Sequence, residues 1–160
     1  MRLFWSTAAV SVMLGVLAAR LASASLSRRI PVLGDFAGLE LSFNPGIAWG
    51  MRLPSGIQEA AIGVALIVVI VLAYRENGRM AKWPNGQPTI QPSSHSTITT
   101  AAYGLIVGGG IANIIDRFGD GVVTDYFQVG TFPVFNVADS CVTIGVALLL
   151  LEAFLRPKSV

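Results

Sequence analysis

Four long apolar runs, separated by polar segments, constrain this 160-residue chain more than any other feature of its sequence. They cover about residues 3–26, 57–74, 98–115 and 137–155. A helix of roughly 20 apolar residues crosses the hydrocarbon core of a bilayer, so each run predicts a membrane helix. The chain is only 12% charged, about half the charged fraction of a typical soluble domain. We therefore expect one all-α integral membrane domain, residues 1–160, with four transmembrane helices.

The first run has two interpretations. Its basic start and the small residues at 22–24 are also typical of a cleavable secretory signal. We favour a retained first membrane helix, because further spanning segments follow and a polytopic protein needs no separate cleaved signal.

Residues 27–56 form a polar segment punctuated by proline and glycine. The alternation of apolar and polar residues at 39–43 predicts a short strand, and Asn44-Pro45-Gly46 predicts a turn. We expect a small extracytoplasmic β-hairpin or sheet between the first and second helices. The excess of lysine and arginine near the termini and the loop between the second and third runs favours cytoplasmic termini.

The stretch from residue 108 to 139 is unusually rich in acids for a segment between apolar runs. It holds four of the chain's nine acidic residues, namely Asp116, Asp120, Asp125 and Asp139. Carboxylates beside membrane spans are energetically expensive, and they usually mark a functional site. The net charge is only +2, and no basic stripe suggests a nucleic-acid partner.

Asp125 and Asp139 are the best candidates for chemistry. The connection between them contains Gly130 and Pro133, so it can fold back and bring both carboxylates together. Two close carboxyl groups tend to share one proton. The ionised group can then activate water while the protonated group polarises a peptide carbonyl, with no metal or cofactor.

Other interpretations of these acids remain open. Asp139 could favour the start of a helix through the helix dipole. The four acids could be oxygen ligands of a metal ion, or they could relay protons in a small membrane transporter.

Four motifs in this order resemble those of lipoprotein signal peptidases (signal peptidase II), the membrane aspartyl proteases of bacteria. The family's N-x-G-x-A matches residues 44–48, its G-x-V-x-D-F matches 121–126 with tyrosine last, and its F-N-x-A-D matches 135–139 in full. Its G-N-x-x-D-R matches 112–117, with Ala112 in place of the glycine. The family's first helix usually carries an aspartate with a lysine one turn later, whereas the first run here contains no acid.

The resemblance implies that Asp125 and Asp139 form a catalytic dyad. It also implies a set of substrate-binding residues, namely Asn44, Gly46, Asn113, Arg117 and Asn136. Asp116 is expected to brace Arg117, and Asp120 to lie on a loop surface.

The family's substrates are diacylglyceryl-modified prolipoproteins, which are cut just before the lipidated cysteine. We accordingly expect a monomeric, multi-pass protein of the bacterial cytoplasmic (inner) membrane, with its site near the extracytoplasmic face and lipids and the precursor as its partners. The missing acid in the first run leaves open an inactive relative that binds lipoproteins without cutting them.

Overall fold

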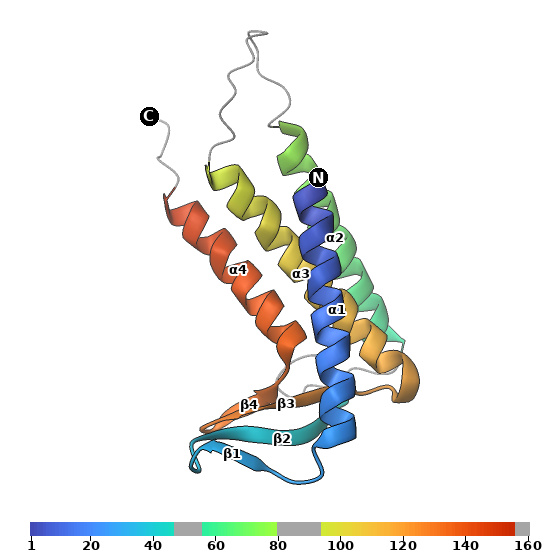
Figure 1. Ribbon diagram of the computed structural model, residues 1–160. Coiled ribbons are helices and arrows are strands. Elements are labelled where there is room, and N and C mark those ends of the chain that lie inside the picture. Colours follow the sequence, from blue (N-terminus) through green and yellow to red (C-terminus); the bar gives the residue numbers. More distant parts are fainter. Residues whose placement is uncertain (47–55, 80–93, 156–160) are drawn as a thin grey trace, which may run out of the picture.

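The computed structural model describes residues 1–46, 56–79 and 94–155, and Figure 1 shows helices alongside one another with a β-sheet at one end. The elements in chain order are α1 (Arg2–Ser25), β1 (Ile30–Leu33), β2 (Ala37–Asn44), α2 (Ile57–Arg79), α3 (Ser94–Asp120), β3 (Val123–Val129), β4 (Phe132–Phe135) and α4 (Val137–Leu155). The N-terminus lies at the end of the helices opposite the sheet, and the strands run across the helix direction (Figure 1).

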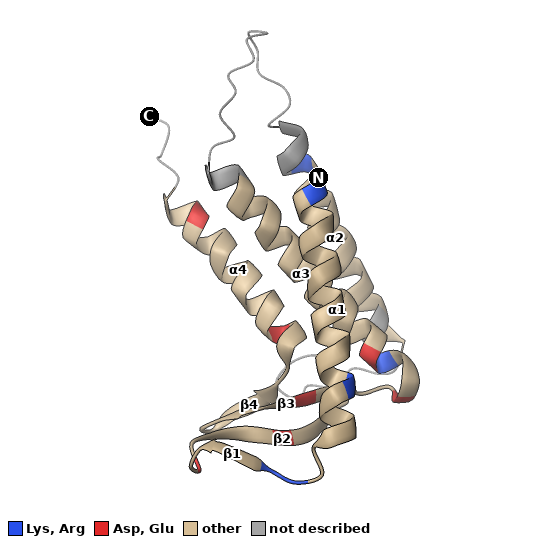
Figure 2. Ribbon diagram, in the orientation of Figure 1, with Lys and Arg blue, Asp and Glu red and all other residues tan. Residues whose placement is uncertain are grey.

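Three helices within the described residues are long and apolar enough to cross a membrane: Arg2–Ser25, Thr97–Asp120 and Val137–Leu155. The second run forms α2, but its apolar part, Ala60–Arg75, is shorter. The expectation of four spans is therefore met for three helices. Figure 2 shows the charged residues of the described part of the chain mainly near the helix ends and on the sheet. The protein is a multi-pass membrane protein.

Helix α3 lies between its neighbours because glycines allow them to approach closely. A Cβ on Gly104 would lie 2.8 Å from the carbonyl oxygen of Phe4, and one on Gly108 would lie 2.5 Å from that of Ala8. On its other side, Gly109 faces the backbone of α4. Small residues at helical spacing let membrane helices pack by close backbone contact, so α3 is the axis of the bundle.

The sheet is antiparallel, with the strand order β1-β2-β3-β4. Its two central strands pair Leu39 with Phe127 and Ser42 with Asp125. Beneath it, Tyr126 forms a buried cluster with Ala22 and Leu26 at the end of α1. The predicted hairpin between the first two helices is confirmed as β1 and β2. However, β3 and β4 lie between α3 and α4, where the sequence suggested only a folded connection.

Only one residue, Asn136, separates β4 from α4. The sheet therefore holds the start of α4 in place. Gly130, at the turn between β3 and β4, has φ 53°, and its N–H donates to the carbonyl oxygen of Phe36. This left-handed conformation is one that glycine adopts at little energetic cost, and it closes the hairpin that returns the chain from Asp125 toward Asp139.

Candidate active site

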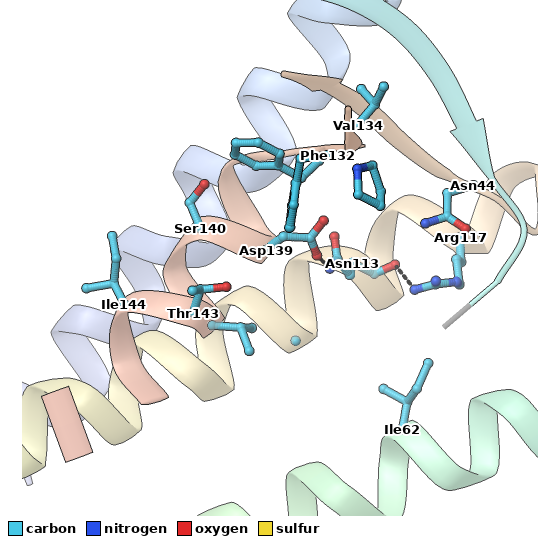
Figure 3. Close-up of a pocket in the computed structure, with 14 residues that line it drawn as sticks. Asn44, Ile62, Asn113, Arg117, Phe132, Val134, Asp139, Ser140, Thr143 and Ile144 are labelled. Carbon is cyan, nitrogen blue, oxygen red and sulfur yellow. Dashed lines mark hydrogen bonds between the residues drawn. The ribbon is translucent and has the colours of Figure 1, made fainter. Parts of the chain in front are cut away.

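The two candidate carboxylates come from different elements that meet near one end of the bundle. Asp125 is the third residue of β3, and Asp139 is in the first turn of α4. Asn113 lies in α3, and Figure 3 shows its side chain directed toward Asp139. Asn136 lies between β4 and α4. The fold thus brings together residues that are up to 26 positions apart.

Two asparagine side chains join the two carboxylates in one hydrogen-bonded chain. Asn136 Nδ2 donates to Asp125 Oδ1 at 2.8 Å and to Asn113 Oδ1 at 3.1 Å. Asn113 Nδ2 donates to Asp139 Oδ1 at 2.7 Å, and the backbone N–H of Asp139 donates to Asn136 Oδ1 at 2.8 Å. These four hydrogen bonds restrain the positions of the two carboxylates relative to each other.

Asp125 is almost completely buried, with 1% of its surface exposed. Its pKa is raised from 3.8 to about 6, first by burial and then by the neighbouring charge of Asp139. Hydrogen bonds from Asn44 and Asn136, and the positive charge of Arg117, oppose this rise in pKa. Burial disfavours the charged form of a carboxyl group, so Asp125 is suited to hold a proton at a pH where an ordinary aspartate has lost it.

Arg117 connects α3 to the chain segment that follows β2. Its Nη2 donates to the carbonyl oxygen of Gly46 at 2.5 Å, and its Nη1 donates to that of Asn113 at 3.4 Å. Gly46 N–H in turn donates to Asn44 Oδ1 at 2.8 Å. The N-x-G part of the first motif is therefore folded against the site, whereas its residues 47 and 48 lie outside the described residues.

Asp116 has a role that sequence reasoning missed. Its Oδ2 accepts a hydrogen bond of 2.6 Å from the backbone N–H of Thr124, the residue before Asp125. This hydrogen bond fixes the start of β3 against α3, and the brace expected for Arg117 stays a prediction. Asp120 is exposed, as expected, but it is the last residue of α3 and not a loop residue; it accepts a hydrogen bond from Val122 N–H at 3.1 Å. The N-x-x-D-R motif could have drawn attention to Asp116, but only the fold supplies its partner.

A cavity of about 720 Å³ opens beside this network (Figure 3). Its lining residues come from the end of β2 and from α2, α3, β4 and α4, and they are Asn44, Ile62, Gly110, Asn113, Arg117, Phe132, Pro133, Val134, Phe135, Asp139, Ser140, Val142, Thr143 and Ile144. Asp139 thus lines the cavity, whereas the buried Asp125 is not among the lining residues. Of the five predicted substrate-binding residues, Asn44, Asn113 and Arg117 line the cavity; Gly46 and Asn136 do not.

No group of three or more His, Cys, Asp or Glu side chains that could hold a metal ion occurs within residues 1–46, 56–79 and 94–155. The arrangement that is present, two linked carboxyl groups of which one is buried, is suited to general acid–base chemistry. This pair of carboxyl groups lies at the end of apolar helices that can cross a membrane. The fold and the site together are therefore those of a membrane enzyme.

The chain matches the family model of signal peptidase (SPase) II over residues 7–155. It therefore belongs to the signal peptidase II family, which makes it a protease. Similar curated relatives are the lipoprotein signal peptidases of Symbiobacterium thermophilum, 36% identical over 82% of this chain and 79% of that protein, and of Halothermothrix orenii, 34% identical over 83% and 81%. The relative from Chlorobium luteolum is 33% identical over 79% of this chain and 74% of that protein.

Two solved structures share the fold. A bacterial membrane enzyme determined at 1.9 Å resolution covers 97% of this chain and 94% of its own, with a TM-score of 0.65 and 24% identity. A second, determined at 2.3 Å, covers 96% and 92%, with a TM-score of 0.66 and 23% identity. The helices and the sheet described above are thus an arrangement that membrane enzymes adopt.

Proposed function

We propose that this protein is an aspartic endopeptidase that removes the signal peptide from diacylglyceryl-modified prolipoproteins, cutting before the lipidated cysteine. Family membership and the activity for which the relatives are named, lipoprotein signal peptidase, support the substrate class. The observation that carries the aspartic mechanism is the hydrogen-bonded chain from Asp125 through Asn136 and Asn113 to Asp139. It holds two carboxyl groups beside a cavity that has room for a peptide.

The environments of the two carboxyl groups suggest separate roles. Asp125, whose pKa is raised to about 6, is the group that binds the proton more readily, and Asp139, which lines the cavity, acts as the base. Asp139 takes a proton from water as the water oxygen bonds to the scissile carbonyl carbon, and Asp125 gives its proton to the carbonyl oxygen. The resulting tetrahedral diol loses the amine after Asp139 transfers its proton to the nitrogen, and a hydroxyl proton returns to Asp125.

The cavity is two-sided in a way that suits a lipidated peptide. Asn44 and Arg117 supply polar groups at one end, where an extended peptide backbone needs partners. Ile62, Val142 and Ile144 supply apolar surface from α2 and α4, against which an apolar signal segment or acyl chain can lie.

The predicted substrate-binding residues divide into two groups under this proposal. Asn44, Asn113 and Arg117 contact the substrate from the cavity wall. Gly46 holds Arg117 through its carbonyl oxygen, and the buried Asn136 positions both carboxylates. The last two residues therefore act through their neighbours.

We place α2 in the membrane as a fourth span, with the sheet and the cavity at the extracytoplasmic face of the bacterial cytoplasmic membrane. The bias of lysine and arginine toward the termini supports this orientation. So does the substrate, because its lipid stays in the bilayer while the bond to be cut meets water. The protein is proposed to work as a monomer.

Cleavage of a synthetic lipidated precursor peptide by the purified protein tests the proposal. Wild-type protein should cut before the modified cysteine, whereas Asp125→Asn and Asp139→Asn should each reduce the rate by about 100-fold or more. Asp120→Asn is the matched control, since this exposed aspartate bonds only a loop N–H in the structure. A wild-type rate in either dyad variant would refute the dyad, and binding without cleavage would identify an inactive relative.

A further inference from the structure

The helix that carries no acid, α1, contacts the candidate active site through a glycine. The buried residues of α1 recur every three or four positions and end with Gly15, Ala19 and Ala22 on the side of the sheet. Gly15, a member of this face, meets two other helices at once. A Cβ at position 15 would lie 2.7 Å from the Cβ of Ala112 in α3 and 3.4 Å from that of Ala138 in α4.

The two alanines at this contact each precede a residue of the hydrogen-bonded chain. Ala112 precedes Asn113 and Ala138 precedes Asp139, and the two polar side chains are joined by the 2.7 Å hydrogen bond. Both alanines are buried, with 2% and 3% of their surfaces exposed. A change in the spacing of α1, α3 and α4 would therefore move the donor of this bond, Asn113, relative to its acceptor, Asp139.

Position 112 is also where the chain departs from the family's motif, which has glycine before the asparagine. The methyl group of Ala112 lies against the place where Gly15 has no side chain. A Cβ–Cβ separation of 2.7 Å is far shorter than the roughly 3.5–4.0 Å of an optimal carbon–carbon contact. Side chains at both positions would thus force α1 away from α3, so the methyl group at 112 requires a glycine at 15.

We propose that Gly15 is a positioning residue of the active site, which forms a complementary pair with Ala112 and holds Asn113 at hydrogen-bonding distance from Asp139. This proposal rests on the proposed function only for its activity readout.

Reciprocal substitution tests the pair. Gly15→Ala should lower kcat on the lipidated precursor peptide by about 10- to 100-fold, because a displacement near 1 Å of a reacting group has effects of this size. KM should change less than threefold. Ala112→Gly alone should cost about two- to threefold in kcat, and the double variant Gly15→Ala/Ala112→Gly should recover kcat to within about threefold of wild type.

Gly104→Ala is the matched control for a loss of helix packing alone. It places the same methyl group at the same α1–α3 interface, 2.8 Å from both Thr7 Cβ and the carbonyl oxygen of Phe4, but nine positions before Asn113 in α3. Both variants should lose thermal stability, yet Gly104→Ala should keep kcat within about threefold of wild type when assayed well below its Tm. Gly63→Ala, where a Cβ meets nothing within 4 Å, should leave kcat unchanged and should not lower thermal stability.

An activity-independent readout is the side-chain amide resonance of Asn113 in protein labelled with ¹⁵N-asparagine. Gly15→Ala should shift this resonance, and the double variant should restore it, even if the peptide chosen is a poor substrate. The inference would be overturned if Gly15→Ala and Gly104→Ala had equal kcat, or if Ala112→Gly failed to rescue both kcat and the resonance. If the double variant restored the resonance but the wild-type protein cut no lipidated precursor, the result would count against the proposed function and not against the pairing of Gly15 with Ala112.

Discussion

Replacing Asp125 with asparagine should make the protein both less active and more stable. In the native protein, burial and the charge of Asp139 raise the pKa of Asp125 from 3.8 to about 6. The native state therefore binds this proton more tightly than the unfolded state does. It follows that the free energy of unfolding of the wild-type protein decreases as the pH rises from about 4 to about 6, and stays lower above that window.

The size of this effect follows from the shift in pKa. One pKa unit corresponds to about 1.36 kcal/mol, so the full shift corresponds to about 3 kcal/mol above pH 6. Water that reaches the carboxylate from the cavity would reduce it, to about 1.5 kcal/mol. Asparagine carries no charge to bury, and its Oδ1 can still accept the hydrogen bond from Asn136 that Asp125 accepts now. Asp125→Asn should thus gain about 1.5–3 kcal/mol at pH 7 and almost nothing at pH 4.

Equilibrium unfolding in mixed micelles, followed by circular dichroism at pH values from 4 to 8, measures this difference. Cleavage of the lipidated precursor peptide by the same preparations should fall by about 100-fold or more. Asp120→Asn, at an exposed position, should show neither change. The reasoning would be refuted if the stability difference between Asp125→Asn and wild type did not grow with pH, or if the variant were less stable than wild type at pH 7.

Three further predictions concern the surroundings of Asp125. In Asp139→Asn, the pKa of Asp125 should fall below about 6, because the neighbouring charge that raises it is gone; ¹³C NMR titration of labelled aspartate would show an unchanged pKa if the two groups were not coupled. Arg117→Gln should raise KM by about 10-fold, because it removes a charge-assisted hydrogen bond to Gly46 that is worth roughly 1.5–3 kcal/mol. It should also raise the pKa of Asp125, because the positive charge that lowers this pKa is gone. Arg117→Lys keeps the charge and should leave the pKa of Asp125 nearly unchanged. Millimolar EDTA should leave the cleavage rate within about twofold, and a loss of activity restored by a divalent cation would support metal-dependent chemistry instead.

The main features of the fold could be predicted because each depends on the local sequence. A run such as 137–155 is apolar along its whole length, and membrane-length apolarity predicts a helix in any tertiary context. The alternation at 39–43 predicted β2 for the same reason. The second run was harder to assign, since Gln58 and Glu59 precede an apolar helix segment, Ala60–Arg75, that is shorter than the other spans.

Strands β3 and β4 were missed because their pattern depends on partners far along the chain. Val123, Thr124, Asp125 and Tyr126 are buried in succession, without the alternation that marks a half-exposed strand. Their burial arises from β2 on one side and from the helices beneath, neither of which can be seen in residues 121–135 alone. For the same reason the partner of Asp116, the N–H of Thr124, could not be inferred.

The sequence by itself determined which residues could perform the chemistry. Few acids occur in this apolar chain, and the spacing of Asp125 and Asp139 around Gly130 and Pro133 already allowed them to meet. The tertiary structure decided how they differ: Asp125 is buried within the sheet and has the raised pKa, while Asp139 faces the cavity. A pKa depends on burial and on hydrogen-bond partners, and both are set by how the elements pack. The sequence alone could therefore not distinguish the buried carboxyl group from the one at the cavity.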